Sequence, residues 1–346
     1  MRAAKPRVAL PLAAAMSEVY ERALLLRLAQ GEVSGDVLAQ EAGLTRAAVW
    51  KRIAALREAG IRIDAVPGRG YTLRHPLELL DPARIREGLP VACQQQLTAL
   101  DVAWSLDSTN SELLRRRAPA QGCAALLAER QTGGRGRRGR QWVSPLAAHV
   151  YLSLARCFEG GLARLGGLSL VTGIAACEAL HTLGFTQVRL KWPNDLVVVT
   201  ATGMHKLGGL LIEGAGEAAG TAHAVIGLGV NVRMPATASA AVSQAWVDLA
   251  GLCATPPSRN TVVVTLLAHL IPALQTFERE GLPAFLSRYA ACDALVGRAV
   301  SVHAAAGVWH AQALGIADDG ALRVRDATGA ERRVHAGDVS VRTDVF

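Results

Sequence analysis

The chain has 346 residues, of which 51% are hydrophobic and 19% are charged, a balance that excludes a disordered protein and allows two or three domains. The formal net charge of +8 at pH 7 favours an anionic partner, such as nucleic acid or phosphate groups. Nearly all of the positive charge is arginine, since lysine occurs only at positions 5, 51, 191 and 206. A lysine retained against this background indicates a position that arginine cannot fill.

The six cysteines are scattered along the chain, at positions 93, 123, 157, 177, 253 and 292. No two of them form a C-x-x-C pair. This distribution predicts reduced thiols in a cytoplasmic protein, with neither a disulfide framework nor a zinc site.

Residues 1–18 combine a basic start with a short apolar run that Pro11 interrupts. The run is too short and too broken for a secretory signal. We expect this segment to be a disordered leader, with Met16 as an alternative initiator.

Residues 19–77 have the spacing of helices followed by a hairpin. VYERALLLRLAQ repeats apolar residues at helical intervals, and the stretch from Ser34 contains a helix, a turn at Gly43 and a second helix that Thr45 can cap. In IRIDAVPGRGYTL two short strands flank a Pro-Gly turn. This order predicts a winged helix-turn-helix, whose second helix lies in the major groove of DNA.

The second of these helices has one apolar stripe, formed by Val49, Ile53 and Leu56. The polar and aromatic residues between them point elsewhere and are therefore free to contact DNA. The predicted DNA-binding segment runs from Ser34 to Ile53, with Thr45, Arg46, Trp50 and Lys51 as its contacts. The alternative is an ordinary helical hairpin with surface arginines.

Residues 80–295 mix strands and helices. AHVYLSLA alternates like a half-buried strand, GGLSLVTGIAACEALHTLG is a helix that Gly184 ends, and QVRLKWPNDLVVV is two strands about a Pro-Asn-Asp turn. With the further strand HAVIGLGVNV, these elements predict an α/β (α+β) domain with a largely antiparallel or mixed sheet. Residues 297–346 are short strands separated by Asp/Gly turns, which predicts a small β-barrel.

The stretch GGRGRRGR, residues 133–140, threads arginines through glycines in the middle of a folded domain. It is not a P-loop, because it lacks the G-K-[ST] ending. An RGG-type nucleic-acid box and a ligand-ordered active-site loop are both open, and the flanking strands favour the second. Such a loop pairs guanidinium groups with carboxylate and phosphate oxygens, and it closes over a reactive acyl phosphate.

Three more stretches carry polar residues beside strands: DSTN (107–110), KWPNDL (191–196) and HKLGGLLIE (205–213). Asp195 is a carboxylate of the kind that holds Mg²⁺ through water in ATP sites, and Lys206 precedes glycines that allow a close approach of backbone to ligand. Taken singly, each stretch is also explained by a turn, a helix cap or a surface lysine.

Together, GRGRRGRQW, KWPNDL and KLGGLLIE in this order resemble the biotin–protein ligases. With SGDVLAQEAGLTRAAVWKRI and the wing VPGRGYTL, the resemblance is to the bifunctional members, the biotin operon repressors. It implies a winged helix-turn-helix over 19–77 and a catalytic domain over 80–295 whose core is similar to class II aminoacyl-tRNA synthetases and biotin ligases. It also implies an SH3-like barrel over 297–346.

The same resemblance implies roles for individual residues. The residues implied to bind biotin are Ser108, Thr109, Asn110, Gln131, Arg135, Gly136, Arg137, Lys206 and Gly229, with Gly227 and Asn231 lining the pocket. Those implied to bind ATP are Arg138, Arg140, Trp142, Asn194 and Trp246. Lys206, Arg137 and Asp195 would be catalytic, and Asp195 would hold Mg²⁺.

The implied reaction joins biotin and ATP into biotinyl-5′-AMP and then transfers biotin to a lysine of the biotin carboxyl carrier of acetyl-CoA carboxylase. The adenylate would also act as corepressor, because a homodimer formed around it binds operator DNA. The rival functions are a biotin-adenylate-sensing transcription factor without ligase activity, a lipoate–protein ligase, and a mono-functional ligase whose N-terminal unit only helps catalysis.

Overall fold

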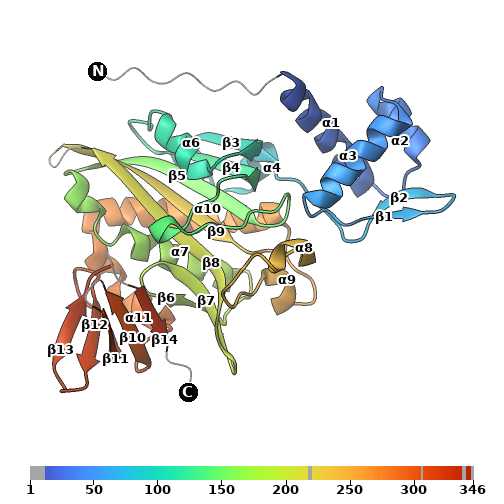
Figure 1. Ribbon diagram of the computed structural model, residues 1–346. Coiled ribbons are helices and arrows are strands. Elements are labelled where there is room, and N and C mark those ends of the chain that lie inside the picture. Colours follow the sequence, from blue (N-terminus) through green and yellow to red (C-terminus); the bar gives the residue numbers. More distant parts are fainter. Residues whose placement is uncertain (1–11, 217–219, 305–306, 337–339, 344–346) are drawn as a thin grey trace.

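The computed structural model of the chain describes residues 12–216, 220–304, 307–336 and 340–343 (Figure 1). These residues form a small helical unit with a hairpin, a large central domain on a seven-stranded sheet, and a C-terminal five-stranded sheet. The first and the last of these units lie on opposite sides of the central domain (Figure 1).

The N-terminal unit is the predicted winged helix-turn-helix. Its elements are α1 (Leu12–Ala29), α2 (Gly35–Ala42), α3 (Arg46–Glu58), β1 (Ile63–Val66) and β2 (Gly70–Leu73). The prediction of a disordered leader over residues 1–18 is wrong for its last part, because α1 already begins at Leu12. Alanine is the strongest helix former, and three alanines follow Leu12 in the sequence. The leader before residue 12 lies outside the described residues.

Side-chain caps fix the ends of the two helices that form the turn. The Ser34 hydroxyl accepts a hydrogen bond from the Val37 backbone N–H, and the Thr45 hydroxyl accepts one from that of Ala48, each at 3.2 Å. Between the helices Gly43 has φ 63°, a conformation that favours glycine. The predicted apolar stripe of α3 is confirmed, since Val49, Ile53 and Leu56 are all buried.

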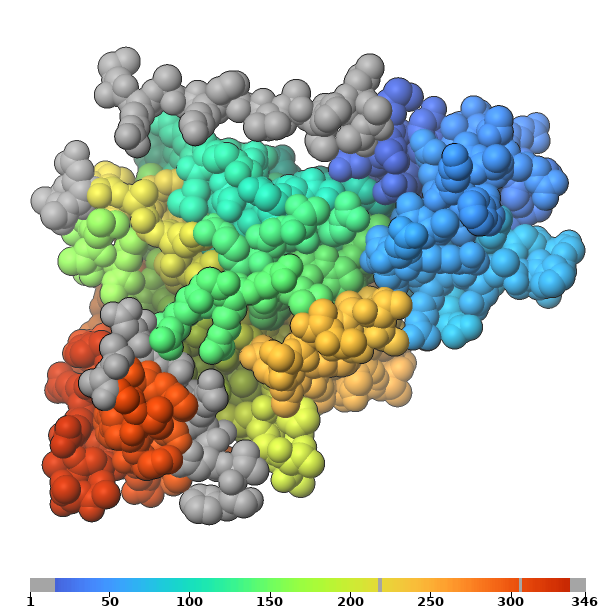
Figure 2. Space-filling model, in the orientation of Figure 1, coloured from blue at the N-terminus to red at the C-terminus, as the bar shows by residue number. Residues whose placement is uncertain are grey.

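The core of the N-terminal unit is completed by the central domain. Leu146 is buried in the same apolar cluster as the three stripe residues of α3, and Trp104 packs against that cluster. The Trp104 indole N–H also donates a hydrogen bond to the Glu21 carboxylate in α1, at 3.3 Å. The space-filling view shows the N-terminal unit in direct contact with the central domain (Figure 2).

The central sheet is mixed, as predicted. Its strands are β3 (Leu97–Leu106), β4 (Cys123–Gln131), β5 (Val150–Glu159), β6 (Val188–Lys191), β7 (Asp195–Thr200), β8 (Gly203–Gly216) and β9 (Thr221–Val230). They lie in the order β3-β4-β5-β9-β8-β7-β6, and among these neighbours β3 and β4 alone are parallel. The connections between antiparallel neighbours therefore bring polar turns to the ends of the sheet.

Helices cover both faces of the middle of this sheet. The helices α7 (Leu168–Thr182) and α10 (Arg259–Glu280) belong to the large core on one face, whereas α6 (Thr109–Arg115) packs through Leu113 on the other. The expectation that AHVYLSLA is half-buried is therefore wrong: residues 150–156 of β5 are all buried. Two segments, Leu162–Thr182 and Arg259–Glu280, are long and apolar enough to cross a membrane, but 56% of each is buried inside this fold.

The remaining elements connect and extend the domain. The further helices are α4 (Pro82–Gly88), α5 (Val91–Gln96), α8 (Ala236–Ser239), α9 (Leu249–Leu252) and α11 (Leu286–Cys292). The C-terminal strands are β10 (Ala299–Ala304), β11 (Gly307–Ile316), β12 (Leu322–Asp326), β13 (Glu331–Val334) and β14 (Ser340–Thr343). A small β-barrel was expected over residues 297–346; the five described strands form one small antiparallel sheet, in the order β13-β12-β11-β10-β14.

Candidate active site

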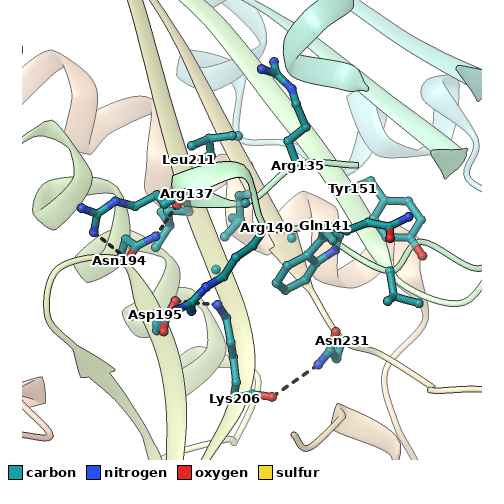
Figure 3. Close-up of a pocket in the computed structure, with 18 of the residues that line it drawn as sticks. Arg135, Arg137, Arg140, Gln141, Tyr151, Asn194, Asp195, Lys206, Leu211 and Asn231 are labelled. Atoms are coloured by element: carbon teal, nitrogen blue, oxygen red, sulfur yellow. Dashed lines mark hydrogen bonds and ion pairs between the residues drawn. The ribbon is translucent and has the colours of Figure 1, made fainter. Parts of the chain in front are cut away.

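A pocket of about 750 Å³ lies between the arginine–glycine loop and the ends of β7, β8 and β9 (Figure 3). Every residue that the sequence assigned to biotin, ATP or catalysis lines it. These residues are Ser108, Thr109, Asn110, Gln131, Arg135, Gly136, Arg137, Arg138, Arg140, Trp142, Asn194, Asp195, Lys206, Gly227, Gly229, Asn231 and Trp246. The arginine–glycine loop and the stretches DSTN, KWPNDL and HKLGGLLIE thus meet in one cavity, while the predicted DNA contacts lie elsewhere, at α3.

The arginine–glycine loop folds back on itself. Trp142 donates its backbone N–H to the Gly134 carbonyl at 2.9 Å, and Gly136 donates to the Arg140 carbonyl at 2.7 Å. At the tip, Arg138 has φ 58° and Gly139 has φ 71°. A non-glycine residue in this left-handed region is strained by about 1–3 kcal/mol, and such strain gathers at functional sites. The loop therefore holds Arg138 in a backbone conformation that this residue would not adopt in an unstrained loop.

The four arginines of the loop differ in whether their side chains are paired. Arg137 donates to the Asn194 side-chain oxygen at 3.3 Å and to the Ala336 carbonyl of the C-terminal unit. Arg135 turns away from these groups and donates to Glu213 at 2.9 Å (Figure 3). Among the described residues, Arg138 and Arg140 form no ion pair, so their charges remain available to a ligand. Burial lowers the pKa of Arg137, but a guanidinium stays cationic at neutral pH.

Lys206 is held by a carboxylate and an aromatic ring. Its ammonium nitrogen lies 2.7 Å from Asp195 Oδ1 and 5.4 Å from the ring centre of Trp142. The register between β7 and β8 shifts at this point, since Leu196 pairs with Gly208 but Val197 pairs with Lys206. Such a bulge re-aims a side chain, which explains how Lys206 joins Asp195 on one side of the sheet.

The charge of the pocket is strongly positive. Of the described residues that line it, six are cationic and one is anionic: Arg135, Arg137, Arg138, Arg140, Lys191 and Lys206 against Asp195. Concave surfaces lined by one sign of charge concentrate counter-ions of the other sign. The pocket is thus suited to ligands that carry several negative charges.

Another part of the pocket wall is a buried network of uncharged side chains, at whose edge Asn110 donates to Glu213, the partner of Arg135, at 2.8 Å. Gln131 accepts hydrogen bonds from the Thr109 backbone N–H at 2.9 Å and from the Thr109 hydroxyl at 3.2 Å. The Ser153 hydroxyl lies 2.7 Å from that of Thr109 and 2.6 Å from the Asn110 side-chain oxygen. Ser108 caps α6 through its hydroxyl, which accepts from the Ser111 backbone N–H at 3.4 Å. This network is preorganised to exchange hydrogen bonds with an uncharged polar ligand group.

Two glycines of β9 leave room for side chains of the site. A Cβ atom at Gly227 would lie 2.4 Å from the Asn110 side-chain oxygen, and one at Gly229 would lie 2.7 Å from the Trp142 ring. Both glycines line the pocket as expected, but the space that they open is occupied by Asn110 and Trp142. Their direct role is therefore to seat these two side chains.

Sequence reasoning missed several residues of the site. Lys191, Gln141 and Tyr151 line the pocket, and Ser153 joins the neutral network from β5. Lys191 had a signal, because it is one of four lysines in the chain and opens KWPNDL. No feature of the sequence marked Tyr151 and Ser153 as site residues, since they lie in a strand whose composition is that of the core. The fold and the pocket together define an enzyme for anionic substrates that is joined to a DNA-binding unit.

Known families match all three units. Residues 102–231 match the Biotin/lipoate A/B protein ligase family, residues 295–342 match the biotin protein ligase C terminal domain, and residues 21–72 match an HTH domain. The chain is 40% identical over 282 residues to the bifunctional ligase/repressor BirA of Salmonella typhimurium, covering 81% of this chain and 84% of that protein. It is equally similar to BirA of Escherichia coli K12, at 40% identity and the same coverage.

The biotin–[acetyl-CoA-carboxylase] ligase of Mycobacterium tuberculosis is 33% identical over 77% of this chain and 96% of that protein. The solved biotin protein ligase from Aquifex aeolicus in complex with biotin and ATP has the same fold, with a TM-score of 0.61 at 23% identity over 72% of this chain and 100% of that one. The chain therefore belongs to the family of biotin protein ligases, in its group of bifunctional ligase/repressors.

Proposed function

We propose that this pocket carries out both steps of an ATP-dependent biotin transfer. The observation that supports it best is that one continuous cavity combines a buried network of uncharged side chains with a cluster of cations that includes Arg137, Arg138, Arg140 and Lys206. Biotin carries an uncharged ring system and a carboxylate, and ATP carries phosphates. The neutral network suits the ring system, and the cations suit the carboxylate and the phosphates.

In the first step a biotin carboxylate oxygen attacks the α-phosphorus of ATP. The new P–O bond forms as the bond to pyrophosphate breaks, and pyrophosphate leaves with the bonding electron pair. Lys206, which its ion pair with Asp195 fixes before the reaction, stabilises together with Arg138 and Arg140 the charge that builds on the phosphate oxygens. Arg137, held by Asn194, orients the carboxylate, and Trp246 and Trp142 offer faces for the adenine.

In the second step the ε-amine of a carrier lysine attacks the acyl carbon of biotinyl-5′-AMP. The amide bond forms, AMP leaves with the electron pair of the acyl–oxygen bond, and the amine loses a proton. The carrier we propose is the biotin carboxyl carrier of acetyl-CoA carboxylase. The loop that carries Arg137 and Arg138 excludes water from the anhydride between the two steps.

Magnesium fits this site only together with the nucleotide. Mg²⁺ prefers six oxygen ligands, and Asp195 is the one carboxylate among the described lining residues. Asp195 would hold the ion through one oxygen, beside its ion pair with Lys206, and the phosphates would supply further ligands. When bound, the ion neutralises phosphate charge.

For the second role we propose that α3 binds operator DNA. Trp50 is 60% exposed on α3, Lys51 is exposed beside it, and Arg46 pairs with Asp36 where both are open to solvent. The dimer that binds a two-part operator would form when the adenylate orders the pocket loops, so ligand, dimer and DNA stabilise one another. The cytoplasm is the proposed location, in keeping with six free cysteines.

The test of the ligase reaction is biotin-dependent exchange of labelled pyrophosphate into ATP, with lipoate as the parallel substrate. Exchange with biotin alone is expected. Exchange with lipoate alone would replace biotin as the substrate, and exchange with neither acid would leave a sensor without ligase activity.

DNA binding is tested by selecting duplexes from a random pool and measuring their affinity with and without biotin plus ATP. We expect tighter binding when both are present. Equal affinity in the two conditions would contradict the proposed coupling of ligand to DNA.

A further inference from the structure

Two cysteines and a histidine meet outside the active site. Cys177 and His181 lie one turn apart on α7, and Cys292 is the last residue of α11. Their ligand atoms all lie within 4.8 Å of one another, and this is the one such group of three or more among the described residues. Both cysteines are buried and His181 is partly exposed, so the group lies just beneath the surface.

The spacing of Cys177 and His181 matches one edge of the tetrahedron that a bound zinc ion requires. Tetrahedral Zn²⁺ with Zn–S bonds of about 2.3 Å and Zn–N bonds of about 2.0–2.1 Å puts sulfur and nitrogen about 3.5 Å apart. The Cys177 sulfur lies 3.5 Å from His181 Nε2. The Val188 carbonyl oxygen lies beside both atoms and accepts hydrogen bonds from the Cys177 thiol at 3.4 Å and from His181 Nε2 at 2.9 Å. The chain thus provides three metal-ligating side chains with one polar oxygen next to them.

The chemistry of the donor atoms indicates which ions would fit this group. Two sulfurs with one imidazole form a donor set that favours Zn²⁺ and other thiophilic divalent cations over Mg²⁺ or Ca²⁺.

We propose that Cys177, His181 and Cys292 bind a thiophilic divalent cation such as Zn²⁺, in a structural site separate from the catalytic pocket. Binding releases the two thiol protons and uses the neutral form of His181, with Nε2 facing the ion. The fourth position is taken by the Val188 carbonyl or by water. This proposal differs from the expectation from cysteine spacing, because its ligands come from two helices that are distant in the sequence.

The position of the site gives it a structural effect. The Val188 carbonyl belongs to β6, and β6 ends at Lys191, which lines the catalytic pocket. Directly after Cys292, the chain pairs with β6, where the Ala294 backbone N–H donates to the Leu190 carbonyl at 2.8 Å. A bound ion would tie α7 to α11 and to this edge strand, just before the chain enters the C-terminal sheet.

The test uses Co²⁺ and Zn²⁺ alone on the full chain, purified with chelator and reductant. We expect one equivalent of Co²⁺ to give thiolate-to-cobalt charge-transfer absorption and the intense visible bands of a tetrahedral site, and Zn²⁺ to displace it. Cys292→Ser should weaken binding by more than about ten-fold, since even the loss of a group that supports a ligand costs 10–100-fold. Cys253→Ser is the matched control, because Cys253 is partly buried and outside the group.

A second measurement covers the case in which Cys292→Ser does not fold. In the wild-type chain, Zn²⁺ should raise the midpoint of thermal unfolding, because an ion that binds only the folded chain stabilises it, and added chelator should reverse the rise. Either of two results would overturn the proposal: no charge-transfer absorption in the wild-type chain, or the same unfolding midpoint with and without Zn²⁺. Because no step uses biotin or ATP, neither result bears on the ligase reaction.

Discussion

The ammonium group of Lys206 and the carboxylate of Asp195 face each other at 2.7 Å across two neighbouring strands, β8 and β7. Both side chains are largely shielded from water, with 18% and 25% of their surface exposed. The pairing fixes the lysine above the Trp142 ring before any substrate is present. A cation positioned in this way needs little reorganisation when charge develops on a phosphate, which is the condition for strong electrostatic catalysis.

Lys206→Ala should lower biotin-dependent pyrophosphate exchange by roughly 10²–10³-fold, the effect of removing one preorganised charge-stabilising group. The thermal unfolding curve should keep its shape, because the lysine is not part of the apolar core. Lys51→Ala is the control, since Lys51 is exposed on α3 and remote from the pocket. Normal exchange by the Lys206 variant would remove this residue from the mechanism.

Gly227→Ala should weaken biotin binding by roughly 10- to 100-fold, because displacement of a binding group by about 1 Å costs this much. The new methyl group would lie 2.4 Å from the Asn110 side-chain oxygen and would break its hydrogen bond with Ser153. Titration calorimetry with biotin measures the change. Gly133→Ala is the control, since its nearest neighbour would be at an ordinary 3.4 Å, and equal affinity of the two variants would contradict the assignment.

Glu129→Gln should lower the free energy of unfolding by about 3–5 kcal/mol, because it leaves a buried guanidinium without its counter-charge. Arg259 lies 2.7 Å from Glu129, and their side chains are 6% and 3% exposed. Urea unfolding followed by circular dichroism gives the difference. The exposed pair of Arg27 and Glu41 is the comparison, where Glu41→Gln should cost less than about 1 kcal/mol.

Stability should fall as the pH is lowered below about 6.5, and His149 should be one cause. Burial lowers the pKa of His149 to about 3, so the folded chain holds this imidazole neutral while the unfolded chain protonates it at its ordinary pKa of about 6.5. The contribution is fully present above pH 6.5 and is lost towards pH 3, by about 1.4 kcal/mol per unit.

His149→Gln keeps a polar side chain at that position but cannot titrate there. The pH dependence of its unfolding free energy between pH 7 and 5 should therefore be shallower than that of the wild-type chain. Parallel curves for the two proteins would show that His149 does not carry the effect.

Much of the fold and the site was predictable because the signals are local. Ser34 and Thr45 cap helices through their own neighbours, and KWPNDL is a turn whose polar residues necessarily share one sheet end. What failed depends on contacts between distant segments. The burial of β5 on both faces requires α6 to lie opposite α7, and neither helix contributes a signal to the strand itself.

Contacts between distant segments also limit how far the role of a single residue can be predicted from the sequence. Gly229 matched a biotin-lining position, yet the position of its missing side chain is filled by Trp142, a contact between the loop and β9 that no spacing reveals. Ser153 and the cysteine–histidine group likewise depend on how strands and helices pack. Sequence motifs therefore identified the pocket, whereas its internal contacts required the three-dimensional arrangement.

Leu146 lies four residues after Trp142, yet it is buried in the core of the N-terminal unit. A ligase cut from its DNA-binding unit at residue 78 would expose this leucine and one side of Trp104 to water. Leu146, which follows the arginine–glycine loop in the chain, would then lose its apolar contacts with the N-terminal unit. The two activities belong to separate stretches of the sequence, but the two units share one apolar cluster. Removing the N-terminal unit therefore exposes apolar side chains of the central domain.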